Sequence, residues 1–324
     1  MGLIRLAWWN VENLFDHKDA SRHPDLARRL QNELKGWTVQ VRDRKLDQLA
    51  SVISSMFENQ GPDFLGICEV ENEEVVQLLV DRLTLPDRSY AVLTHDTEDL
   101  RGIEISFIYD KKILSCSNTG FHSIIKRSAT RDIFWTTITH RITGTSFIVA
   151  GNHWPSRSGG QYETEPFRML TAETVSYLLS HQHLTTGSQL PFPVLLMGDF
   201  NDEPFNRSIQ EYLLAKRDPK QVVRAKNPLF WNCMWPLMST VPSGTFYYGS
   251  EWNMLDQCMV TKEFLKKDSP LTLHPEGVTI YRTKAMQKRN GTPRRFGRPA
   301  QKISYDRNGY SDHFPIVLQL EFTK

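Results

Sequence analysis

The composition is that of an ordinary folded protein. The chain has 324 residues, 40% of them hydrophobic and 23% charged, which excludes a disordered or fibrous polypeptide. Its 39 Lys and Arg against 37 Asp and Glu leave a net charge of +2, so the overall field does not attract a polyanion and any basic patch must be local. No run of about 18 apolar residues is present, and the first apolar segment begins at Leu3, too close to Met1 for a cleavable signal sequence. We therefore expect a cytoplasmic protein without a membrane span.

Alternating strands and helices are predicted along the chain. Short apolar runs rich in β-branched and aromatic residues predict strands over 3–9, 63–68, 103–109, 133–141, 146–150, 194–197, 254–260 and 316–320. Helical periodicity predicts helices over 45–59, 73–83 and 167–180. The turn residues 143–145 favour an antiparallel hairpin between two of the strands. These elements predict an α/β fold with two mixed sheets packed face to face and helices outside.

Three long stretches interrupt this pattern, near 16–43, 218–252 and 261–310. No low-complexity linker or fixed-period repeat divides the chain, so we expect one domain over 1–324 with these stretches as insertions or loops. The last stretch carries a basic run over 281–307 with a single acid, Asp306: Arg282, Lys284, Lys288, Arg289, Arg294, Arg295, Arg298, Lys302 and Arg307. Such a run is typical of a solvated loop, or of a phosphate-backbone contact beside a phosphate-cleaving site.

Polar residues lie repeatedly at the ends of the predicted apolar strands. They are Asn10, Glu69, Asn152 with His153, and Asp199 with Asn201, while Asp256 lies near the start of its strand and Asp312 with His313 precede the last one. Singly, each is typical of a turn, a cap or a structural histidine. Together they indicate a site, because a sheet holds such side chains in fixed geometry.

The metal chemistry of this set is that of a hard cation. Carboxylates such as Glu69 and Asp312 suit Mg²⁺ or Mn²⁺, which bind through one or two carboxylates, waters and phosphate oxygens. The four cysteines, at 68, 116, 233 and 258, have no CxxC spacing. They are interpreted as reduced buried thiols and not as a zinc site or disulfide framework.

Six motifs in order identify a family resemblance. WNVEN at 9–13, GICEVEN at 66–72, GNHWPSR at 151–157, GDFND at 198–202, LDQCMV at 255–260 and YSDHFPI at 310–316 resemble those of the endonuclease/exonuclease/phosphatase superfamily. Its members include deoxyribonucleases, abasic-site endonucleases, neutral sphingomyelinases and inositol-polyphosphate phosphatases. The resemblance implies a four-layer α/β sandwich with the site at one end of two packed sheets.

The resemblance also implies a role for each matching residue. Glu69 would be the principal metal ligand, with Asn10 beside it and Asp312 helping to hold the metal. The remaining roles fall to five residues: Asp199 would orient or deprotonate the attacking water, Asn201 and His153 would bind the phosphate, and His313 would bind it while held by Asp256. Such a site supplies a cation and fixed donors for the charge that gathers on a phosphodiester under attack.

Two arginines are further candidates for substrate binding. Arg101 introduces a strand, as a similar Arg-Gly segment does in some bacterial members, and Arg157 lies in a loop shaped by Pro155 and a glycine pair. Either arginine is also compatible with a surface position or a turn. The tryptophans at 231, 235 and 252 can stack on bases or cover the sandwich.

The sequence predicts a Mg²⁺- or Mn²⁺-dependent phosphodiesterase, in the first place a nuclease acting on DNA or RNA. The alternative is a phosphatase or phosphodiesterase of small or lipid-linked phosphate esters, since the motifs recognise the phosphate and not what is attached to it. A third class, a silent binding protein, is disfavoured because every chemical position keeps a competent residue. No obligatory protein partner can be inferred from the sequence.

Overall fold

The fold was analysed in a computed structural model that describes residues 2–97, 99, 101–125, 130–181, 192–301 and 305–323. The strands are β1 (Leu3–Leu14), β2 (Phe64–Val70), β3 (Tyr90–Thr94), β4 (Glu104–Asp110), β5 (Leu114–His122), β6 (Ile133–His140), β7 (Ser146–His153), β8 (Val194–Asp199), β9 (Trp231–Asn232), β10 (Phe246–Tyr248), β11 (Glu251–Asn253), β12 (Asp256–Val260), β13 (Leu271–Ile280) and β14 (Ile316–Phe322). The helices are α1 (Pro24–Leu30), α2 (Val39–Asn59), α3 (Glu73–Val80), α4 (Gln161–Ser180) and α5 (Pro219–Arg224), with short η turns at Ser208–Tyr212, Trp235–Ser239 and Lys262–Phe264. Among these described helices, none combines the length and the apolar character needed to span a membrane.

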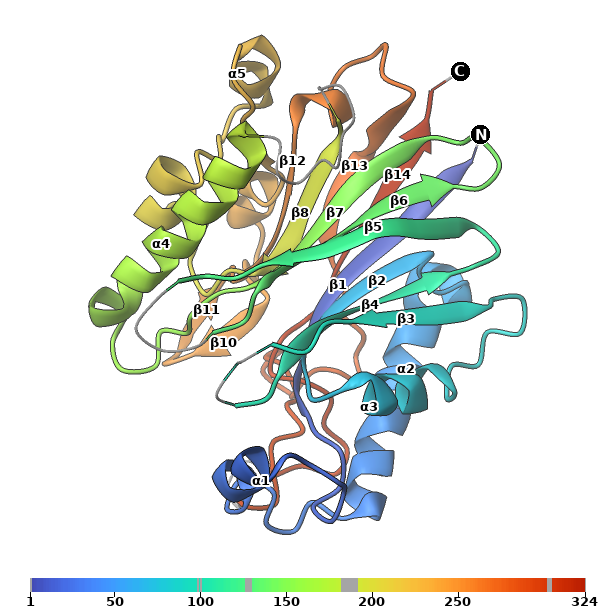
Figure 1. The fold of residues 1–324 in the computed structure, drawn as a ribbon, viewed down its shortest axis with the longest axis vertical. Coiled ribbons are helices and arrows are strands. Elements are labelled where there is room, and N and C mark those ends of the chain that lie inside the picture. The colour runs from blue at the N-terminus through green and yellow to red at the C-terminus, as the bar shows by residue number, and fades with distance from the viewer. Residues whose placement is uncertain are drawn as a thin grey trace.

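Two six-stranded mixed sheets form the centre of the molecule (Figure 1). Their strand orders are β13-β14-β1-β2-β4-β3 and β5-β6-β7-β8-β12-β9. Each sheet has one parallel pair at its middle, β1 with β2 and β7 with β8, and antiparallel pairs on both sides. A helix crosses over between the strands of each parallel pair, α2 in the first sheet and α4 in the second.

Alternation along the strands builds the four layers. In β1, Leu6 and Trp8 belong to the apolar cluster between the sheets, whereas Ala7 and Trp9 face the cluster that contains Leu46 of α2. A third cluster joins the outer face of the second sheet to α4. Figure 1 shows α4 flanking one sheet, and α2 and α3 flanking the other. The predicted α/β sandwich of two packed mixed sheets flanked by helices is confirmed.

The long stretches contain more secondary structure than expected. All eight predicted strands and all three predicted helices are present, and the 143–145 turn joins the antiparallel pair β6 and β7. The 261–310 stretch, expected as an insertion or a loop, contains β13 over 271–280, which forms an edge of the first sheet. The 16–43 stretch holds α1 and the start of α2, and the 218–252 stretch holds α5, β9 and β10.

Several arginines of the basic run over 281–307 contact other residues of the protein. Four of its arginines are partly buried and contact other side chains: Arg294 pairs with Asp306, Arg295 with Glu12 and Arg298 with Glu33, while Arg282 lies over the rings of Trp252 and Phe314. Lys302 lies outside the described residues.

All four cysteines are free thiols, three of them buried and Cys116 partly exposed.

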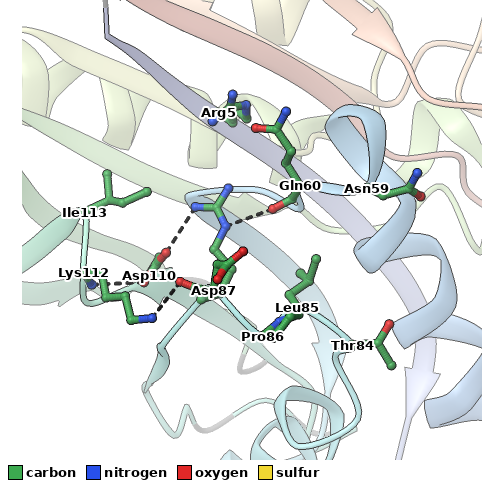
Figure 2. A pocket seen from close by; sticks show the side chains of 11 residues that line it. Arg5, Asn59, Gln60, Thr84, Leu85, Pro86, Asp87, Asp110, Lys112 and Ile113 are labelled. Carbon is green, nitrogen blue, oxygen red and sulfur yellow. Dashed lines mark hydrogen bonds and ion pairs between the residues drawn. The ribbon is translucent and has the colours of Figure 1, made fainter.

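The end of the sandwich where β1 and β2 begin is closed by a buried ion-pair network. Arg88 pairs with Asp63 and Asp110 and donates to the carbonyl oxygens of Gln60 and Gly61. Figure 2 shows Gln60 and Asp110 around the 460 Å³ pocket at this end. Because these polar groups satisfy one another, we assign this end a structural role.

Candidate active site

The candidate residues meet where the two central parallel pairs end. Asn10 lies near the end of the paired part of β1, Glu69 lies near the end of β2, and His153 and Asp199 end β7 and β8 side by side. The register between β1 and β2 shifts after Asn10, and Glu69 has a left-handed φ of 65°. Such irregularities turn side chains away from the regular pleat and are costly for non-glycine residues. Here they aim Glu69 toward the second sheet.

Asp199 is the centre of the cluster. Its Oδ2 accepts a hydrogen bond of 3.0 Å from Asn10 Nδ2, and its Oδ1 accepts one of 3.0 Å from the backbone N–H of Asn201. Burial raises the pKa of Asp199 to about 6; the charge of His313 opposes this rise and the carboxylate of Asp256 adds to it. A carboxylate held this way binds a proton more readily than an exposed aspartate.

His313 and Asp256 form a buried pair. The Nδ1–H of His313 donates to Asp256 Oδ2 at 2.6 Å, and its Nε2 lies 4.0 Å from Asp199 Oδ2. Burial alone would lower the pKa of His313, but Asp256, and then Asp199 and Asp312, raise it well above the usual range. The raised pKa favours the doubly protonated ring, whose Nε2 faces Asp199.

His153 lies between the carboxylates of the two sheets. Its Nε2 is 3.7 Å from Glu69 Oε1 and 3.8 Å from Asp199 Oδ2. Burial lowers the pKa of His153 well below its usual value, and the positive charges of Arg131, Arg101 and His313 lower it further. The lowered pKa favours the neutral imidazole at His153, whereas the raised pKa favours the charged one at His313; both rings lie near Asp199 Oδ2.

Glu69 is an ionised carboxylate with one oxygen fixed. The backbone N–H of Asn13 donates to its Oε2 at 2.9 Å. Burial favours the protonated form, but the charges of Arg101, His313 and Arg131 and a hydrogen bond from Asn10 lower the pKa of Glu69 below its ordinary value. Its Oε1 faces His153 at a distance wider than a hydrogen bond.

Two sets of described residues have the chemistry to hold a divalent cation. Ligand atoms of Asp199, Asp256 and His313 lie within 4.8 Å of one another, although His313 and Asp256 already share a hydrogen bond. The predicted ligands Glu69 and Asp312 form the second set. Glu69 Oε1 lies 3.8 Å from Arg101 Nη1, and Asp312 Oδ2 lies 3.8 Å from Arg295 Nη2. Burial raises the pKa of Asp312 to about 7, and Glu12 and Glu69 add to the rise against His313 and Arg295. A cation relieves such crowding of carboxylates, so these oxygen donors fit Mg²⁺ or Mn²⁺.

The two predicted arginines occupy different positions. Arg101 lies at the rim, its side chain 45% exposed and its Nη1 3.8 Å from Glu69 Oε1. Arg157 lines the cleft beside Asn201. It donates to Asn201 O at 2.7 Å, to the side chains of Asn206 and Asn253, both at 3.1 Å, and to Asp202 at 3.4 Å. Arg157 thus ties the loop after β7 to the loop after β8 and to β11, and one of its N–H groups has no acceptor among the described residues.

Sequence reasoning missed three charged residues behind the site. The carboxylate of Glu12, 1% exposed, accepts from Arg295 Nε at 2.8 Å and from the backbone N–H groups of Phe296 and Gly297. Lys45 of α2 is fully buried and donates to the backbone oxygen of Glu12. Glu12 stands in the WNVEN motif beside Asn10, which was a usable signal. Arg295 belongs to the basic run over 281–307, which indicates a solvated loop or a phosphate contact and not a pair with Glu12. Lys45 carries no signal, since it lies outside every motif.

The four-layer sandwich and its buried set of carboxylates, amides and histidines define a class of phosphoric ester hydrolases. The chain matches the endonuclease/exonuclease/phosphatase family over residues 5–322, and it belongs to this family. No curated protein matches it significantly.

Solved structures of this family share the fold. The human Nocturnin catalytic domain with bound sulfate is 17% identical, with a TM-score of 0.54 over 99% of this chain and 95% of that one. The mannosyl-6-phosphatase of Bacteroides thetaiotaomicron VPI-5482 is 16% identical, with a TM-score of 0.58 over 98% and 100%. TDP2 of D. rerio, complexed with single strand DNA product, is 15% identical, with a TM-score of 0.56 over 99% and 100%. At these identities the likeness concerns the fold.

Proposed function

We propose that this protein is a divalent-metal-dependent phosphodiesterase, a nuclease that hydrolyses DNA or RNA phosphodiester bonds by in-line attack of water. The observation that carries the proposal is the position of Asp199. It faces His313, whose raised pKa favours the charged ring, and His153, whose lowered pKa favours the neutral ring, at the ends of both central strand pairs. This combination supplies an acceptor for the proton of water and donors for phosphate oxygens.

The metal site consists of Glu69, Asn10 and Asp312 in this proposal. Mg²⁺ or Mn²⁺ bound there stabilises the negative charge that develops on the phosphate. The oxygen chemistry of the three side chains and the crowding of Asp312 by Glu12 and Glu69 support it.

The remaining residues handle the proton and the phosphate. Asp199 orients the attacking water and accepts its proton. His313, held by Asp256, and the neutral His153 donate hydrogen bonds to phosphate oxygens from opposite sides. The side-chain amide of Asn201 donates one hydrogen to the carbonyl oxygen of Trp154, and its second hydrogen donates to a phosphate oxygen in this proposal. Arg101, at the rim, is placed to contact a neighbouring phosphate.

A polymeric substrate is supported by the surroundings of the site. A cleft of 690 Å³ adjoins Asn201 and is lined by Phe246 and Tyr248. The Phe246 ring lies 4.6 Å from that of His313, and Tyr248 is 76% exposed. Exposed aromatic rings beside a phosphate site suit a nucleobase. Exposed cations of the basic run are candidates for backbone contacts: Lys284, Lys288, Arg289 and Arg307.

The test is hydrolysis of supercoiled plasmid, single-stranded DNA and RNA with Mg²⁺ or Mn²⁺, beside bis-p-nitrophenyl phosphate. Asp199→Ala should abolish turnover, whereas Asp87→Ala, the same change at an exposed residue of the far end, should not. Cleavage of a polymer that weakens steeply with salt supports the nuclease. Hydrolysis of the small ester alone would redirect the search to small or lipid-linked phosphates. Absence of all hydrolysis would contradict the proposal and favour a binding protein.

A further inference from the structure

Lys45 is a buried cation close behind the site. It is the single lysine of α2, and its side chain has no exposed surface. Its ammonium lies 5.2 Å from the ring centre of Phe296 and 6.0 Å from that of Trp37. Burying a lysine is costly unless its charge is compensated. Burial lowers its pKa to about 8, while Glu12, Asp312 and Glu69 favour its charged form.

The partner of Lys45 is one particular peptide group. Glu12 and Asn13 have left-handed φ angles of 55° and 54°, and the pairing of β1 with β2 is interrupted between Asn10 and Leu14. The peptide between Glu12 and Asn13 therefore leaves the sheet ladder. Its carbonyl oxygen accepts from Lys45 Nζ, and its N–H donates to Glu69 Oε2 at 2.9 Å.

This peptide thus has a cation at its oxygen and a carboxylate at its hydrogen. The two contacts orient the same dipole in the same direction, and hydrogen bonds in such a chain strengthen one another. With Oε2 of Glu69 held by Asn13, its Oε1 stays directed toward His153, 3.7 Å away. Lys45 does not need to touch Glu69 to hold it.

We propose that Lys45 is a positioning residue for Glu69, acting through the Glu12–Asn13 peptide group. The inference rests on the proposed function, in which Glu69 is the principal metal ligand. The change in metal affinity that it predicts for removal of Lys45 is opposite in sign to the change predicted by charge repulsion alone. A cation near a metal site repels the metal, so removing Lys45 would tighten metal binding if charge alone mattered. Loss of positioning weakens it.

The experiment compares three variants with the wild type. Lys45→Met removes charge and donor but keeps a long apolar side chain, and Lys45→Gln keeps an N–H donor without charge. The control is Arg88→Met, which removes a buried cation at the opposite end of the sandwich, near the pocket of Figure 2. Mn²⁺ affinity is measured by calorimetry, and the Asn13 amide proton shift is measured by NMR without metal.

For Lys45→Met we expect Mn²⁺ binding about tenfold weaker, the size typical for the loss of a group that orients a metal ligand. The Asn13 amide proton should move upfield because its hydrogen bond weakens. For Lys45→Gln, the Mn²⁺ affinity and the Asn13 shift should lie between those of Lys45→Met and the wild type. This variant replaces Lys45→Met in the test if Lys45→Met does not fold. Arg88→Met should lower stability but change neither readout.

Unchanged or tighter Mn²⁺ binding in both Lys45 variants, or an unmoved Asn13 proton, would overturn the inference. If the wild type itself neither binds Mn²⁺ nor hydrolyses phosphodiesters, the proposed function fails. The Asn13 shift, which needs no metal, then decides the Lys45 inference alone.

Discussion

Glu104 in β4 makes the stability of the protein depend on pH. Its side chain is 2% exposed, and its Oε1 accepts from Thr97 Oγ1 at 3.0 Å. Its Oε2 is buried without a hydrogen-bond partner in the part of the chain that the structure describes. Burial raises the pKa of Glu104 to about 7; the hydrogen bonds from Thr97 oppose this rise, and Asp99 and Asp96 add to it.

The size of the effect follows from the two pKa values of Glu104. Its pKa is 4.5 in the unfolded chain and about 7 in the folded protein. Between these two pH values the folded protein holds a proton on Glu104 that the unfolded chain has released. The stabilisation is complete below the unfolded pKa and is lost as the pH rises through the folded pKa. Between roughly pH 5 and pH 8.5 the wild type should lose about 2.5 kcal/mol of unfolding free energy through this group.

Glu104→Gln removes the titration. The assay is urea unfolding of both proteins at several pH values, with the difference in unfolding free energy plotted against pH. A change in stability caused by the amide itself does not depend on pH, so it does not affect the slope of this plot. Glu58→Gln, at an exposed position, is the matched control and should show a flat difference. A flat difference for Glu104→Gln as well would refute the reasoning.

Two further changes probe the site itself. Asp256→Asn removes the charge that holds His313 protonated, and should lower kcat about 100- to 10,000-fold with little change in KM; near-normal kcat in a folded variant would contradict the pairing. Gly198→Ala puts a Cβ 2.4 Å from the backbone oxygen of Asn152, so it should force β7 and β8 apart and cost about 1–3 kcal/mol. Equal urea midpoints for Gly198→Ala and wild type would contradict this prediction, because they would show that β7 and β8 accommodate the Cβ without a loss of unfolding free energy.

The strands that sequence reasoning found differ physically from those it missed. β2 and β8 are apolar on both faces because they are central in their sheets, and such runs are recognisable. β13 is an edge strand whose middle carries Pro275, Glu276 and Gly277, and its pairing shifts register there. β5 is half-exposed and polar. Edge strands do not bury both faces, so their sequences lack the apolar signal.

The sequence by itself determined which side chains end the central strands. Apolar runs specify where a strand is buried, and the polar residue that follows each run must then emerge at the sheet end, so Glu69 and Asp199 could be named from the sequence. Only the tertiary structure decided what surrounds them. Arg295 reaches Glu12 across 283 positions, and Lys45 lies on a helix whose pattern is otherwise amphipathic. Nothing in local sequence encodes such a pairing, because it depends on how the layers pack.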